Sequence, residues 1–99
     1  MVRHIILWKF LPSLDEGRRA AETARLTDAF RSLKGRIPGL VDIEFARNFN
    51  PDNDYDAALF STFTCKEALD AYQTHPAHAE VKNTIPGCLG SRACVDYEI

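Results

Sequence analysis

The nine residues from Val2 to Phe10 constrain the fold of this chain more than any other stretch. They are rich in β-branched and aromatic side chains and contain no glycine or proline, which predicts a β-strand. Alternate side chains of a strand point to opposite faces. One face would carry Val2, His4, Ile6, Trp8 and Phe10, and the other Arg3, Ile5, Leu7 and Lys9. Because both faces are largely apolar, we expect both to be covered over most of the strand.

The length of the chain limits what can supply that cover. Ninety-nine residues are enough for one modest core, so we predict a single domain over residues 1–99. The helices of the chain itself can cover one face of a sheet. The second face then needs a partner, and the simplest partner is another copy of the chain in a homodimer.

Charge and composition argue against several classes of protein. The net charge is −2 and the basic residues are scattered, whereas nucleic-acid-binding proteins concentrate positive charge on one surface. No apolar run approaches membrane-spanning length, and the first residues lack a signal-peptide pattern. Cys65, Cys88 and Cys94 show no CxxC spacing, which is typical of reduced cytoplasmic thiols. We therefore expect a cytoplasmic protein with no nucleic-acid or membrane partner, and interpret Cys94 as a small core side chain.

Capping and turn signals divide the rest of the chain. Ser13 with Glu16 matches a capping box, which predicts a helix from Ser13 to about Arg36, and Thr64 with Glu67 predicts a second, short one. Pro76 suits the first turn of a third helix. The expected strands are residues 40–48, 55–64 and 91–98, the first with Val41, Ile43 and Phe45 on one face.

The resulting order is β-α-β-β-α-α-β. It predicts an α+β fold with an antiparallel four-stranded sheet, of the ferredoxin-like split-βαβ type, in which the second helix is broken in two. Helices would cover one face of the sheet. The other face, with Ile5, Leu7, Ala58 and Phe60, is left for the partner.

Several segments of the chain, in order, resemble one known family, the stress-responsive dimeric α/β-barrel (Dabb) domain. They are Arg3–Phe10, Ile37–Leu40, Arg47–Pro51, Tyr55-Asp56, Glu67–Tyr72, His75–His78 and Val95–Tyr97. The resemblance implies a homodimer in which two four-stranded sheets face each other as a barrel. Each subunit would hold a small cavity between its sheet and its helices.

The same resemblance implies candidate catalytic residues. The family includes uncharacterised bacterial proteins, plant stress-induced proteins and a plant polyketide cyclase, in which a tyrosine and a histidine act as an acid/base pair. Tyr72 and His78 occupy the matching positions, with His4 nearby. The third-strand histidine of the cyclase is Ala57 here, and its first-helix aromatics are largely replaced. These departures argue against the substrate of that cyclase.

Each candidate residue has two interpretations. His78 could transfer protons, with the Tyr72 hydroxyl stabilising an enolate, or it could satisfy a buried polar group. His4 could be a pocket residue or a satisfied core histidine, and His75, which precedes proline, could cap a helix. The expected pocket wall consists of Ile6, Trp8, Leu26, Phe30 and Leu59.

Two functions follow from these interpretations. The first is a cofactor-independent enzyme of cyclase, lyase or isomerase type acting on a small carbonyl or polyketide-like substrate. The second is a non-catalytic stress-response dimer that binds a small apolar ligand. We expect no metal, because His75 and His78 lack the i, i+4 spacing of zinc ligands and no carboxylate is clearly placed to orient them.

Overall fold

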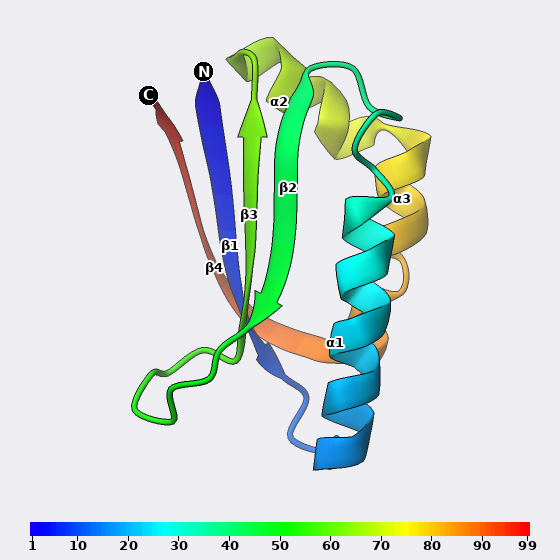
Figure 1. Ribbon diagram of the computed structural model, residues 1–99, viewed down its shortest axis with the longest axis vertical. Coiled ribbons are helices and arrows are strands. Elements are labelled where there is room, and N and C mark those ends of the chain that lie inside the picture. The colour runs from blue at the N-terminus through cyan, green and yellow to red at the C-terminus, as the bar shows by residue number, and fades with distance from the viewer.

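A computed structural model describes residues 1–99 as a four-stranded sheet with three α-helices (Figure 1). The elements are β1 (Val2–Phe10), α1 (Glu16–Arg31), β2 (Leu40–Arg47), β3 (Ala57–Phe63), α2 (Lys66–Thr74), α3 (Pro76–Lys82), the 3₁₀ turn η1 (Ile85–Gly87) and β4 (Leu89–Glu98). This order confirms the predicted β-α-β-β-α-α-β arrangement. None of the helices combines the length and the apolar composition needed to cross a membrane.

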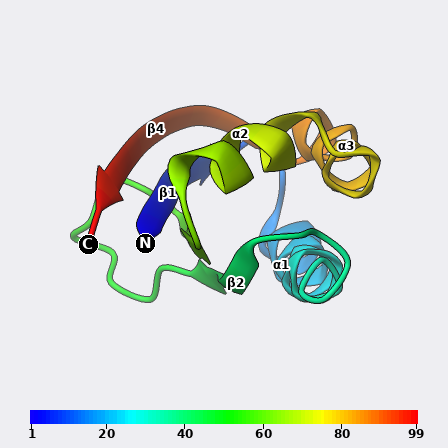
Figure 2. The ribbon, with the colours of Figure 1, turned by 90° about the horizontal axis from the view of Figure 1, so that it is seen from above.

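The sheet has the strand order β2-β3-β1-β4, and every neighbouring pair is antiparallel. The predicted ferredoxin-like α+β fold is therefore confirmed. Strand β1 lies inside the sheet, where His4 pairs with Ser61 of β3 on one side and with Asp96 of β4 on the other. The three helices gather on one side of the sheet, as the view from above shows (Figure 2).

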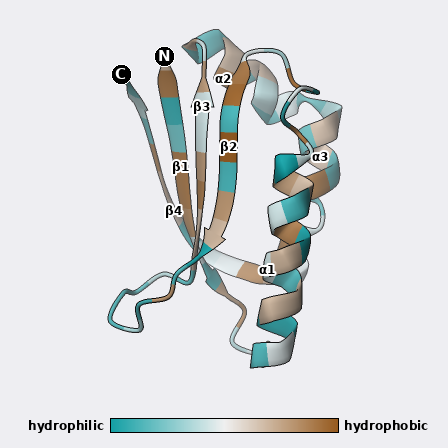
Figure 3. Ribbon diagram, viewed as in Figure 1, coloured by the Kyte–Doolittle hydropathy of each residue, from teal (hydrophilic) through white to brown (hydrophobic).

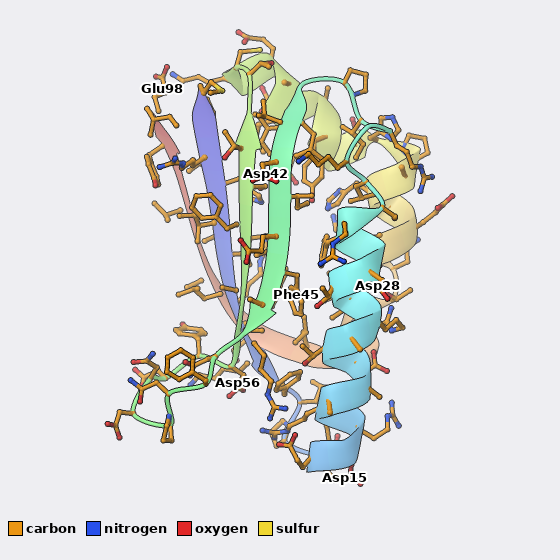
Figure 4. The ribbon with its side chains drawn as sticks, viewed as in Figure 1. Asp15, Asp28, Asp42, Phe45, Asp56 and Glu98 are labelled. Carbon is orange, nitrogen blue, oxygen red and sulfur yellow. The ribbon has the colours of Figure 1, made fainter.

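The two faces of the sheet differ in burial. Trp8, Phe45 and Leu59 on the helix side are buried in the core, and Phe45 points from β2 toward α1 (Figure 4). On the opposite side, Ile5 and Phe60 are only half-buried, and Val95 is 53% exposed. The chain thus covers one apolar face of β1 and leaves the other open, which agrees with the expectation from sequence.

Both predicted capping boxes are wrong. Helix α1 begins at Glu16, and its cap is Asp15, whose carboxylate accepts the Arg18 amide at 2.8 Å. Ser13 instead belongs to the preceding turn, closed by a bond from the Leu14 amide to the Leu11 carbonyl. At α2 the cap position is held by Cys65, with no side-chain hydrogen bond to the helix.

Helix α1 also ends at Arg31, five residues before the predicted Arg36. The following turns contain Gly35 at φ +87°, a left-handed conformation that interrupts a helix. These turns leave Leu33 and Ile37 buried, so the apolar spacing that suggested a longer helix reflects core contacts made by a turn.

Two strand residues also differ from expectation. A register shift between Leu40 and Asp42 puts Leu40 in the core and leaves Val41 40% exposed, although Ile43 and Phe45 are buried as expected. Alternating hydropathy along β2 is visible in Figure 3. Cys94, on the edge strand β4, is exposed rather than a core residue.

Candidate functional site

A cavity of about 150 Å³ lies between the sheet and the helices. Its wall consists of His4, Ile6, Trp8, Phe30, Leu59, Gln73, His78, Lys82, Ile85 and Arg92. Four of the five predicted apolar wall residues line it. Leu26 does not: it is fully buried in the core, beyond the wall.

His4 enters this wall from the helix-facing side of β1. Its position is fixed by the ladders on both sides and by the Ser61 hydroxyl, which donates to the His4 carbonyl at 3.0 Å. The ring nitrogen Nδ1 is hydrogen-bonded to the carboxylate of Asp96. The His4 side chain is buried, with an exposed fraction of only 3%. Asp96 supplies its carboxylate partner, which the sequence did not reveal.

The other two candidates, Tyr72 on α2 and His78 on α3, lie on either side of the junction between these helices, which His75 forms. His75 ends α2 and caps α3, with its Nδ1 accepting the Ala77 amide at 3.0 Å, and Pro76 occupies the first turn. This arrangement matches the capping interpretation of His75. It also turns the chain so that His78, on the first turn of α3, faces back toward Tyr72 of α2.

The structure brings the three predicted residues together. The Tyr72 ring lies 4.1 Å from the ring of His78 and 6.3 Å from that of His4, measured between centroids. Tyr72 itself is fully buried and is not part of the cavity wall, whereas His4 and His78 both line it. Tyr72 therefore lies behind the two histidines.

Two polar atoms in this cluster have no hydrogen-bond partner although they are buried. They are the hydroxyl of Tyr72 and Nδ1 of His78. Burial raises the pKa of Tyr72 far above its usual value, so its hydroxyl keeps its proton at neutral pH. Burial also lowers the pKa of His78; a hydrogen bond with the Gln73 backbone partly opposes this effect, and the nearby Lys82 charge adds to it. His78 is therefore neutral at neutral pH and able to accept a proton.

Sequence reasoning missed three polar residues of the wall, Gln73, Lys82 and Arg92. Lys82 follows His78 by four residues on α3, so helical spacing gave a signal for it. Arg92 lies opposite Trp8 across the β1–β4 ladder, and Gln73 follows Tyr72 on α2. Arg92, like Asp96, reaches the site only through the pairing of the first and last strands, which no local pattern specifies.

Comparison with known proteins places this fold in a family. The model of the stress responsive A/B barrel domain (Dabb) matches residues 2–99. The stress-response A/B barrel domain-containing protein HS1 of Arabidopsis thaliana is 26% identical over 100 residues, which cover 98% of this chain and 88% of that protein.

Solved structures agree with this result. A dimeric protein of unknown function with a ferredoxin-like fold from Bacteroides fragilis is 31% identical, with a TM-score of 0.91 over 99% of this chain and 95% of that one. A hydroxynitrile lyase from Passiflora edulis is 16% identical, with a TM-score of 0.80 over 99% of this chain and 92% of that one. That second likeness concerns the fold alone. Since the family model covers nearly every residue, the chain belongs to the stress-responsive A/B barrel domain (Dabb) family.

Proposed function

We propose that this protein is a homodimeric, cofactor-independent enzyme of the cyclase, lyase or isomerase type that transfers a proton on a small carbonyl substrate. The observation that carries the proposal is the state of His78. It lines the cavity, and its Nδ1 is buried without a partner beside the equally unpaired hydroxyl of Tyr72. Buried polar groups are rarely left unpaired, and active sites are where such exceptions gather.

The pKa shifts suggest how the roles divide. His78 is neutral and acts as the general base, taking a proton from the carbon next to the carbonyl group. Tyr72 keeps its proton and donates a hydrogen bond to the oxygen on which negative charge develops. The proton held by His78 then returns to the product. Because Tyr72 lies behind the cavity wall, its hydroxyl reaches the substrate oxygen only when the His78 ring moves locally.

Other residues of the wall fit an anionic intermediate. Lys82 and Arg92 bring positive charge to the cavity, which favours negative charge on a bound oxygen. Asp96 holds the His4 ring in one orientation through the bond to Nδ1, so that His4 assists from the sheet side.

The size of the cavity favours a small substrate. A volume of about 150 Å³ is close to that of an engineered protein cavity that accepts benzene, and well below the range of drug-sized pockets. This supports the small-carbonyl alternative over a polyketide-like chain. A hydroxynitrile lyase with the same fold is consistent with lyase chemistry, although the fold does not specify the reaction.

The homodimer is part of the same proposal. Ile5, Leu7 and Phe60 form an apolar surface on the open face of the sheet, where a second copy can cover it. The similar Bacteroides fragilis structure is a dimeric protein.

A second candidate function is binding of a small apolar ligand without catalysis. The observation in its favour is the apolar part of the wall, in which Trp8 and Phe30 stack 6.4 Å apart beside Ile6 and Leu59. In this alternative the two histidines have only a structural role.

A ligand screen on two histidine variants distinguishes the alternatives. Small aldehydes, ketones and hydroxynitriles are tested for thermal stabilisation and for turnover with wild type, His78→Ala and His75→Asn. The asparagine keeps a helix-capping side chain, so it is the matched control. The enzyme proposal expects turnover in wild type and in His75→Asn, and its loss in His78→Ala. Equal stabilisation and equal turnover in all three proteins would remove His78 from the mechanism.

A further inference from the structure

The side chains of His4, Cys94 and Asp96 form a second cluster of interest on the helix-facing side of the β1–β4 ladder. His4 and Asp96 are directly paired across the two strands, and Cys94 lies two residues before Asp96 on the same face. Their donor atoms all lie within 4.8 Å of one another. The N-terminal part of β1 and the C-terminal part of β4 run side by side at this place (Figure 1).

The geometry points to a binding site for a divalent transition-metal ion of the Zn²⁺ class, held by His4 Nδ1, Cys94 Sγ and an oxygen of Asp96. The sulfur lies 3.8 Å from Nδ1 and 4.0 Å from the carboxylate oxygen. Metal–ligand bonds of about 2.0–2.3 Å in a tetrahedral site hold neighbouring donors roughly 3.3–3.6 Å apart. The two sulfur distances need to shorten by only a few tenths of an ångström, and the His4–Asp96 contact opens to admit the ion.

The donor set selects the class of metal. One imidazole, one thiolate and one carboxylate form a borderline-soft site, which suits Zn²⁺ or Co²⁺ and not the hard ions Mg²⁺ or Ca²⁺. Two anionic ligands neutralise the charge of the ion. Three protein ligands leave a fourth position for water or a small ligand, as in catalytic rather than structural zinc sites.

The protons balance in a simple way. The Cys94 thiol loses its proton to solvent when the sulfur binds the ion. The proton between His4 Nδ1 and Asp96 moves to the other ring nitrogen, Nε2, so that the Nδ1 lone pair faces the metal. One proton is thus released for each ion bound.

The surroundings supply support and access. Both strands hold the three side chains on a regular ladder, and the Ser61 hydroxyl fixes the His4 main chain at 3.0 Å. Asp96 also borders an open groove of about 380 Å³ between β4 and α2, through which an ion can enter. Metal binding at Nδ1 requires no substrate, but it replaces the His4–Asp96 bond that orients His4 in the proposed acid/base chemistry. The metal-bound and the hydrogen-bonded forms of His4 are therefore alternative states, and Co²⁺ binding is measured separately from turnover.

A cobalt titration tests the site. Reduced, chelator-treated protein is titrated with Co²⁺ under anaerobic conditions, and we expect thiolate-to-cobalt charge-transfer absorption that saturates at one ion per chain and disappears when Zn²⁺ is added. Mg²⁺ should not displace the cobalt. Cys94→Ser should abolish the charge-transfer band, and Asp96→Asn should weaken Co²⁺ binding by about tenfold or more.

Two controls keep the result specific. Cys65→Ser removes an exposed thiol at the start of α2, outside this cluster, and should bind Co²⁺ like wild type. Asp96→Asn retains a hydrogen-bonding partner for His4, so it separates loss of the ligand from loss of the fold. The inference is overturned if wild type shows no thiolate band, or if the band persists unchanged in Cys94→Ser.

Discussion

Replacing Tyr72 with phenylalanine should make the protein more stable and less active at once. The side chain is fully buried, and its hydroxyl has no hydrogen-bond partner. Phenylalanine keeps the ring, and with it the contacts to the rings of His78 at 4.1 Å and Phe63 at 4.9 Å. The substitution therefore removes the unpaired polar atom and little else.

The size of the effect follows from the burial of that atom. Leaving a buried hydroxyl unpaired costs about 1–3 kcal/mol of stability. Removing the hydroxyl recovers this energy, but the small void that it leaves offsets part of the gain. We expect the free energy of unfolding to rise by roughly 1–2 kcal/mol. For a domain of this size, each kcal/mol corresponds to a rise of about 4–8 °C in Tm.

Urea unfolding followed by fluorescence, at a fixed protomer concentration, measures the change. Tyr97→Phe is the control, since Tyr97 is 39% exposed and its variant should stay within about 0.5 kcal/mol of wild type. If Tyr72 donates to the reacting oxygen, kcat/KM of Tyr72→Phe should fall by at least about 100-fold. A variant less stable than wild type by 1 kcal/mol or more would refute the reasoning, because the hydroxyl would then be paired in the folded protein.

Three further predictions concern the fold, the pH dependence and the dimer. Gly39→Ala should destabilise the protein by about 1–3 kcal/mol more than Gly35→Ala, because both have positive φ but only at Gly39 would the new Cβ lie 2.5 Å from a side-chain atom of α2; equal urea midpoints would contradict this. The pKa of His78 is lowered by burial. As the pH falls through about 6.5, His78 therefore takes up a proton in the unfolded chain before it does so in the folded protein. The free energy of unfolding should then decrease as the pH falls below that value. In His78→Gln this loss should be smaller, whereas parallel stability–pH curves would disprove the assignment. Phe60→Glu should give a monomer in sedimentation experiments, while Ala21→Glu, which introduces a glutamate at an exposed position of α1, stays dimeric; a dimeric Phe60→Glu would exclude the open face as the interface.

Much of the fold could be predicted because its signals are local or repeated. The apolar faces of the strand from Val2 to Phe10 and the proline at the start of α3 both specify structure within a few residues. The helix start could not be placed, because Ser13 and Asp15 are both good capping residues and the choice depends on the turn before them. The exposure of Val41 follows from a register shift that no alternation pattern reveals.

The candidate site could also be predicted only in part. Tyr72, His78 and His4 could be named through the family resemblance, and they do come together. Asp96 could not, because it lies 92 residues from its partner His4 and meets it only through the register of β1 with β4. Contacts of this kind depend on the whole topology, so they become visible only in three dimensions.

The late position of β4 in the chain has a consequence for how the protein is made on the ribosome. Strands β2, β3 and β1 can pair while β4 is still being synthesised, and this leaves one edge of β1 unpaired in the nascent chain. Closing that edge joins residues far apart in the sequence, such as His4 and Asp96 with a separation of 92 residues, and such pairing is slow compared with helix formation. His4 therefore gains its carboxylate partner only after β4 has been synthesised, and a polypeptide that stalls before β4 exposes the aggregation-prone edge of β1 in its place.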